Sequence, residues 1–234
     1  MTPDFGAAVR HHTRDTWFAR LAIVAIIALQ TLVINDLALG PRWLAPTVEL
    51  ALLIPLSIAS VWTQTRARLA DAAHHWHLWT RQRQAIRVVA LILTGIISLM
   101  NLGALLDLVR ALLKGRQATG GTLLIDALNI WTTNVIIFAL WFWEMDRGGP
   151  AARCTRREAE PDFLFPQMTD SHPVPHWQPG FIDYLFVSFT NATAFSPTDT
   201  LPLTPAAKLV MMLEATISLL TVALVAARAV NILA

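Results

Sequence analysis

Charged residues are scarce in this 234-residue chain. They make up 15% of it, whereas about 25% is usual for a soluble domain, so the composition argues against a water-soluble protein. Acidic and basic residues are nearly balanced, at 16 and 18, which gives no indication of nucleic acid as a partner. The single cysteine, Cys154, excludes an intrachain disulfide and a cysteine-based metal site.

Catalytic motifs are absent as well. The chain contains no G-x-S-x-G, no H-E-x-x-H and no phosphate-binding loop. His74, His75 and His77 lie close together, but consecutive histidines do not share a helical face, so at most two of them can chelate one ion. An interfacial segment of aromatic and basic residues is the simpler interpretation of this cluster, with metal binding or pH sensing as the alternative. The sequence therefore predicts no enzyme, no cofactor and no metal site.

Long apolar runs take the place of such motifs. Five of them are near the length of about 20 residues that crosses a bilayer, and they cover residues 17–39, 46–63, 86–113, 122–145 and 206–233. Most of the 18 basic residues fall in the loops on the N-terminal side of the membrane, and basic loops stay in the cytoplasm. We therefore predict a multi-pass protein of the cell inner (plasma) membrane, with its N-terminus in the cytoplasm.

Three regions follow one another along the chain. Residues 1–145 are predicted to form a four-helix membrane region, residues 146–178 a proline-rich loop, and residues 179–234 a hairpin with the last transmembrane helix. Within the loop, the apolar stretch from Asp162 to Pro166 is expected to pack back onto the bundle. In the last region a short amphipathic aromatic segment precedes a polar turn and a proline-marked step into the final helix. That order is typical of a segment that enters the membrane part-way and turns back, which needs protein or water around it.

The predicted fold class is therefore an all-α integral membrane protein with five transmembrane helices plus one re-entrant pore-like helix. Residues 183–190, with the sequence DYLFVSFT, form the expected pore-like helix. With Thr193, Asp199 and Pro202 behind it, this segment resembles the pore domain of two-span potassium channels, where a T-x-G-x-G-D filter precedes a proline. The resemblance implies a pore constriction formed by seven consecutive residues: Thr193, Ala194, Phe195, Ser196, Pro197, Thr198 and Asp199.

This constriction departs from the potassium-channel pattern. Ser196 and Thr198 replace the filter glycines, and Pro197 replaces the tyrosine. A potassium filter stacks backbone carbonyls around the ion, and the backbone conformations that this requires favour glycine. We therefore expect a wider polar constriction of hydroxyls and the Asp199 carboxylate, without the usual potassium selectivity.

A second resemblance covers about residues 141–233. An L-x-F-P loop at Leu164-Phe165-Pro166, the D-Y-L-x-x-S-F-T helix, the S-x-T-D turn and the final A-x-N helix end together are similar to an uncharacterised family of bacterial inner-membrane proteins that has only a domain-of-unknown-function label. This resemblance implies a fold and no activity.

The last helix resembles the channel inner helix. Met211, Glu214, Ser218 and Thr221 share one helical face by their spacing. We predict that this face lines the pore, and the alternative is a helix-packing face joined by hydrogen bonds.

One pore loop cannot enclose a channel alone, so we expect a homo-oligomer, with a tetramer as the expected form. The expected partners are the lipid bilayer, further copies of the chain and inorganic cations. The predicted function is an ion-conducting pore, non-selective or weakly cation-selective. The alternatives are a non-conducting membrane scaffold with a decayed channel fold, and a small-solute transporter.

Overall fold

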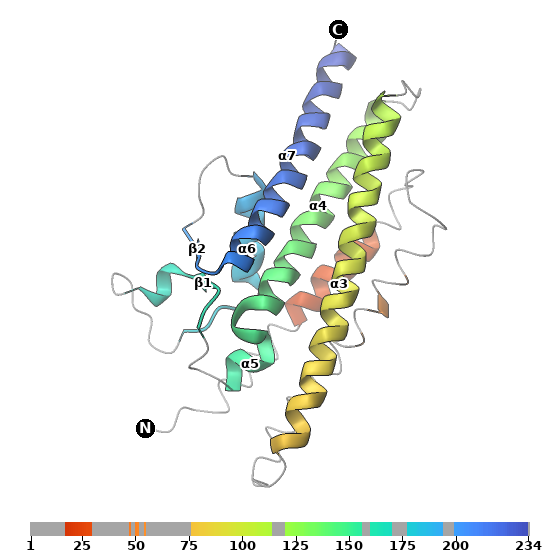
Figure 1. Ribbon diagram of the computed structural model, residues 1–234. Helices are drawn as coiled ribbons and strands as arrows, with labels where there is room; N and C mark the ends of the chain where they lie inside the picture. Colours follow the sequence, from red (N-terminus) through yellow and green to blue (C-terminus); the bar gives the residue numbers. More distant parts are fainter. Residues whose placement is uncertain are drawn as a thin grey trace.

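The structure is a computed structural model, shown in Figure 1. It describes residues 17–29, 47, 50, 51, 54, 76–113, 120–155, 160–169, 177–193 and 199–233. Most of the described residues are helical, which confirms the predicted helical class. Besides helices and connecting segments, the described residues include a pair of two-residue strands, β1 (Phe163–Leu164) and β2 (Leu201–Pro202), which pair antiparallel.

Three long helices form the body of the protein: α3 (Trp76–Leu113), α4 (Gly120–Met145) and α7 (Pro205–Leu233). Segments Arg87–Leu112, Leu124–Gly148 and Pro205–Ala226 are long and apolar enough to cross a membrane, so three of the five predicted spans are confirmed as candidates. The predicted span 17–39 is described only as a shorter apolar helix, Trp17–Leu29. The predicted span 46–63 lies mostly outside the described residues, and within the part of the chain that the structure describes there are three candidate spans.

Helix α4 is the central element, because 67% of its membrane-length window is buried, against 33% for α3 and 22% for α7. It packs against α3 on one side and against α6 and α7 on the other (Figure 1). Hydrogen bonds supplement the α3 contact: Asn101 Nδ2 donates to the Ile130 carbonyl over 3.2 Å, and Trp141 Nε1 donates to Ser98 Oγ over 2.9 Å. Polar side chains between apolar helices commonly pair in this way.

Short elements occupy part of the predicted proline-rich loop. They are η1 (Asp146–Gly148), α5 (Pro150–Thr155), β1 and η2 (Pro166–Met168). The chain reverses sharply after α4, where Arg147, Gly148 and Gly149 all have positive φ, at 52°, 80° and 94°. A Cβ atom added at Gly149 would lie 3.1 Å from the Glu144 carbonyl oxygen, so glycine is required on both conformational and steric grounds.

Helix α6 (Phe181–Thr193) is short, and it runs antiparallel along α4. Its first residue, Phe181, stacks edge-on against Trp143 near the C-terminal end of α4, and Phe189 contacts Trp131, three turns earlier in α4. The chain is back at the starting end by β2, because β2 pairs with β1 there. Helix α6 therefore goes part-way along the bundle, and β2 lies back at the end where α6 begins.

Candidate functional site

The sequence of α6 explains its orientation in the bundle. At its start, the Asp183 carboxylate accepts a 2.7 Å hydrogen bond from the Gly180 amide, which fixes the first turn. Its buried positions follow a helical period, and its outward positions are large and apolar. The buried set is Phe181, Tyr184, Val187, Ser188 and Ala192. A half-length helix that is apolar on its outer face is consistent with a membrane environment.

A cluster of charged residues lies at the N-terminal end of α6, beside the C-terminal end of α4, and we call this end the base of α6. Tyr184 donates its hydroxyl to Asp146 Oδ2 over 2.5 Å, and both residues are fully buried. The Arg153 guanidinium lies 5.0 Å from the centre of the Tyr184 ring and donates to the carbonyls of Trp143 and Asp146, at 2.6 and 2.9 Å. Burial raises the pKa of the Tyr184 hydroxyl well above its ordinary value, against the opposing effect of Arg153, so this group remains a donor at neutral pH.

Asp162 connects this base to the start of α7. Its amide donates to Asp146 Oδ1 over 2.8 Å, and its carboxylate accepts from the Arg147 amide (3.2 Å) and the Thr204 hydroxyl (2.6 Å). Thr204 Oγ1 also accepts a 3.3 Å bond from the Ala207 amide, so it caps the N-terminus of α7. One aspartate therefore joins the end of α4, strand β1 and the entry to α7.

The aromatic residues of the stretch from Asp162 to Pro166 pack onto the same base. Phe163 and Phe165 are buried, and their rings meet the Tyr184 ring edge-on at centroid distances of 6.2 and 5.5 Å. The expectation that this stretch packs back onto the bundle is thus met in the structure. Phe165 and Tyr184, two of the residues that suggest a family resemblance, are therefore structural residues of this base.

A second polar cluster lies halfway along α6 and contains Glu214, which is fully buried. Asn191 Nδ2 is 2.7 Å from Glu214 Oε2 and 2.9 Å from the Met211 carbonyl oxygen. Ser188 Oγ is hydrogen-bonded to Glu214 Oε1 and lies 2.6 Å from the Val135 carbonyl oxygen of α4. This cluster joins α4, α6 and α7 through neutral partners of a carboxyl group.

Ser218 and Thr221 of α7 are buried on the same face as Glu214. Asn134 Nδ2 of α4 donates to Ser218 Oγ over 3.0 Å, and Thr221 Oγ1 donates to the Ile217 carbonyl over 2.8 Å. Ser218 and Thr221 are each only 1% exposed, and Met211 is half-buried. The face predicted from the spacing exists, but it meets α4 and α6 inside one subunit. In this conformation Glu214, Ser218 and Thr221 are buried and do not border an open path. This arrangement corresponds to the alternative prediction, a helix-packing face joined by hydrogen bonds.

The predicted constriction is only partly described. Thr193 ends α6 and is exposed, with its hydroxyl donating to the Phe189 carbonyl over 2.7 Å. Asp199 is also exposed, just before the buried Thr200. The five residues between them, Ala194, Phe195, Ser196, Pro197 and Thr198, lie outside the described residues.

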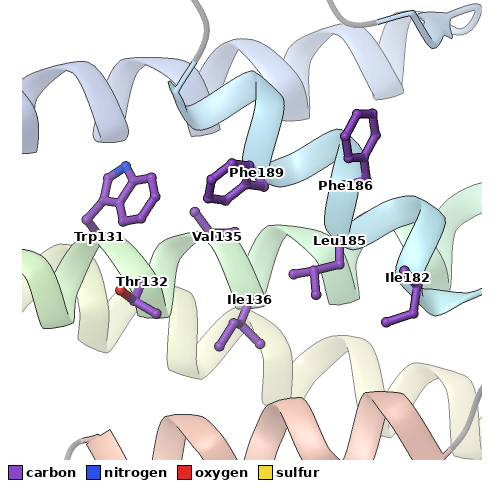
Figure 2. Close-up of a pocket in the computed structure, with 8 residues that line it drawn as sticks. All are labelled: Trp131, Thr132, Val135, Ile136, Ile182, Leu185, Phe186 and Phe189. Atoms are coloured by element: carbon purple, nitrogen blue, oxygen red, sulfur yellow. The ribbon is translucent and has the colours of Figure 1, made fainter.

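An apolar groove of about 400 Å³ lies between α4 and the outer side of α6. Figure 2 shows its lining side chains. Trp131, Thr132, Val135 and Ile136 come from α4, and Ile182, Leu185, Phe186 and Phe189 come from α6. The Thr132 hydroxyl is already bonded to the Leu128 carbonyl, at 2.8 Å. The groove therefore suits hydrocarbon better than a polar solute.

Sequence reasoning missed most of the residues that hold the hairpin: Asn134, Asp146, Asp162, Tyr184, Ser188 and Asn191. Three of these lie within or beside the DYLFVSFT segment, but a spacing pattern gives no information about their partners. The partners of Ser188, for example, are 26 and 53 residues away in the sequence. Among the residues that the structure describes, no three His, Cys, Asp or Glu side chains converge as a metal site.

Comparisons with known proteins give no relative. No family model matches the chain, and no curated protein or solved structure matches it significantly. The resemblances to potassium-channel pore domains and to the uncharacterised bacterial family therefore remain predictions from the sequence.

Proposed function

We propose that this membrane protein forms an ion-conducting pore, non-selective or weakly cation-selective, at the turn between α6 and α7. The observation that supports the proposal is the placement of α6 and β2. Helix α6 enters the bundle beside the C-terminal end of α4, and β2 lies at that same end. Non-helical backbone at membrane depth is stable only inside protein or beside water. A turn that combines hydroxyl groups with the exposed Asp199 carboxylate favours water and cations.

The pore requires several copies of the chain. One hairpin cannot surround an axis, so we propose a homo-oligomer, with a tetramer as the expected form. The constriction is assigned to residues 193–199, from Thr193 to Asp199. Glu214 becomes a positioning residue for α6, because its carboxyl group is bonded to Ser188 and Asn191. The polar groups of Ser218 and Thr221 are occupied within α4 and α7. The proposal includes no enzyme activity and no cofactor.

The protein is proposed to lie in the cell inner membrane with its N-terminus in the cytoplasm. The basic residues of the loops support this orientation. With five spans, the hairpin would then enter from the cytoplasmic side, opposite to the pore loop of potassium channels.

A non-conducting membrane scaffold is the second candidate. The observation that favours it is the closed packing of the α7 polar face, where Glu214 and Ser218 are bonded to α6 and α4. In this case the hairpin is a purely structural element, and the protein serves to hold partners in the membrane.

The two candidates differ in oligomeric state and in flux. Native mass spectrometry of the purified protein should give a homo-oligomer, and proteoliposomes should pass monovalent cations faster than empty liposomes. Asp199→Asn should reduce cation flux several-fold, because it removes the only carboxylate of the proposed constriction. Asp107→Asn is the matched control, since Asp107 is a carboxylate on α3 that pairs with Arg110 at 2.7 Å.

The possible outcomes separate the assignments. A monomer, or wild-type liposomes no leakier than empty ones, supports the scaffold and rejects the pore. Wild-type flux that Asp199→Asn leaves unchanged keeps the pore but removes Asp199 from its constriction.

A further inference from the structure

Ser188 has two oxygen neighbours and only one proton to share with them. Its Oγ lies 2.6 Å from the Val135 carbonyl oxygen, and it is also hydrogen-bonded to Glu214 Oε1. A carbonyl oxygen accepts hydrogen bonds and never donates them. The proton between Ser188 and Val135 must therefore come from Ser188. The hydrogen bond between Ser188 and Glu214 then needs a proton from the Glu214 side.

Asn191 settles the role of the second carboxyl oxygen. Its Nδ2 is 2.9 Å from the Met211 carbonyl oxygen, which identifies this end of the side chain as the NH₂ group. The other Nδ2 proton points to Glu214 Oε2 at 2.7 Å. Oε2 is therefore an acceptor, and Oε1 is the oxygen that remains to donate to Ser188.

We infer that Glu214 is a protonated carboxylic acid, a buried proton-binding site whose O–H joins α7 to Ser188 of α6, and through Ser188 to α4. In this arrangement each of the four hydrogen bonds around Ser188, Asn191 and Glu214 has one donor and one acceptor. An ionised Glu214 would have to take the Ser188 proton, and the 2.6 Å contact between Ser188 and Val135 would then hold two oxygens with no hydrogen between them.

The surroundings of Glu214 agree with a neutral group. Its partners from α6 are the neutral side chains of Ser188 and Asn191, and α4 contributes the Val135 carbonyl and Asn134, which binds Ser218 one turn along α7. Among the described residues no side chain forms an ion pair with Glu214. The titratable groups elsewhere on these helices whose side chains the structure describes are Asp126, Glu144, Asp183, Tyr184 and Lys208, and none of them is bonded to Glu214. A buried carboxylate without a counter-ion is strongly disfavoured, whereas the acid form is not.

This inference concerns the packing inside one subunit, so it holds whether or not the protein conducts. If the proposed pore is correct, the same proton sets the depth of the turn, because Ser188 and Asn191 lie in the last two turns of α6. Removal of the proton would then break the connection between α6 and α4 through Ser188.

Infrared spectroscopy tests the inference directly. The whole protein is measured at neutral pH in an alkyl maltoside, which has no ester carbonyl to overlap the signal. Wild-type protein should show the C=O stretch of a protonated carboxylic acid, and Glu214→Gln should lose that component. The glutamine keeps one donor and one acceptor in the same positions, so it suits the neutral network. Asp107→Asn, the change of a half-buried carboxylate that pairs with Arg110, should leave the acid band intact.

Two further measurements cover the case in which Glu214→Gln does not fold. Labelling the wild-type protein with ¹³C-glutamate should move the band, and Ser188→Ala should shift it by removing the acceptor of the acid proton. Identical acid regions in wild-type and Glu214→Gln spectra, with a lost carboxylate band instead, would overturn the inference. An acid band that moves neither with the label nor in Ser188→Ala would do the same.

Discussion

The cluster at the base of α6 is built from charged groups, whereas the cluster halfway along α6 is built from neutral ones. At the base, the Asp146 carboxylate accepts from a hydroxyl and an amide, and the cations Arg147 and Arg153 lie beside it. Halfway along, the Glu214 carboxyl has only neutral partners. The base lies at the end of a candidate span and the second cluster within one, so charge is kept where counter-charges are available and avoided where they are not.

The two clusters also have different structural roles. The base cluster joins distant parts of the chain, because Asp162 connects the end of α4 to the first turn of α7. The halfway cluster joins three adjacent helices at one level. The first cluster therefore determines the path of the chain, and the second determines the position of α6 along the bundle.

Asp146→Ala should have the largest effect, because it removes the centre of the charged cluster. The change leaves the Tyr184 hydroxyl and the Asp162 amide without an acceptor and removes the carboxylate that lies 3.9 Å from Arg147 Nε. Loss of one partner from a buried charged site costs about 3–5 kcal/mol. Denaturation of the purified protein in detergent measures this cost. A change below about 1 kcal/mol, the range of an exposed ion pair, would mean that the cluster is not a structural centre.

Glu214→Ala should have an intermediate effect, and its comparison with Glu214→Gln sharpens the contrast between the two clusters. Alanine removes one of the two hydrogen-bond partners of Ser188 and one of the two of Asn191, at a cost of about 1–3 kcal/mol. Glutamine preserves a donor and an acceptor, so it should cost well under 1 kcal/mol. The same denaturation assay compares them. If Glu214→Gln were as destabilising as Glu214→Ala, the neutral character of this cluster would be wrong.

The sequence predicted the parts of this structure that depend on neighbouring residues. The three spans are apolar runs of sufficient length, and Glu214, Ser218 and Thr221 share a face because 3.6 residues complete a helical turn. The surface that this face meets depends on the placement of α4 and α6, which no local pattern contains. Asp146 and Tyr184 are 38 residues apart, so neither one alone indicates a buried pair. The two strands are too short for any period to indicate them.

The pair Asn134 and Ser218 should give the smallest effect and measures one neutral hydrogen bond between α4 and α7. Ser218→Ala and Asn134→Leu each remove one partner of the 3.0 Å bond, and the double variant removes both. The cycle of the four proteins isolates the pairwise energy, which is expected to be about 0.5–1.5 kcal/mol.

This cycle also tests the comparison between the clusters. If the neutral network depends on ordinary hydrogen bonds, its pairwise energies stay in this range and lie well below the effect of Asp146→Ala. A coupling of several kcal/mol between Asn134 and Ser218 would show that the halfway cluster is as strongly coupled as the charged base. A coupling near zero would show that apolar packing alone positions α7 against α4. The hydrogen bond would then only satisfy the buried Asn134 donor.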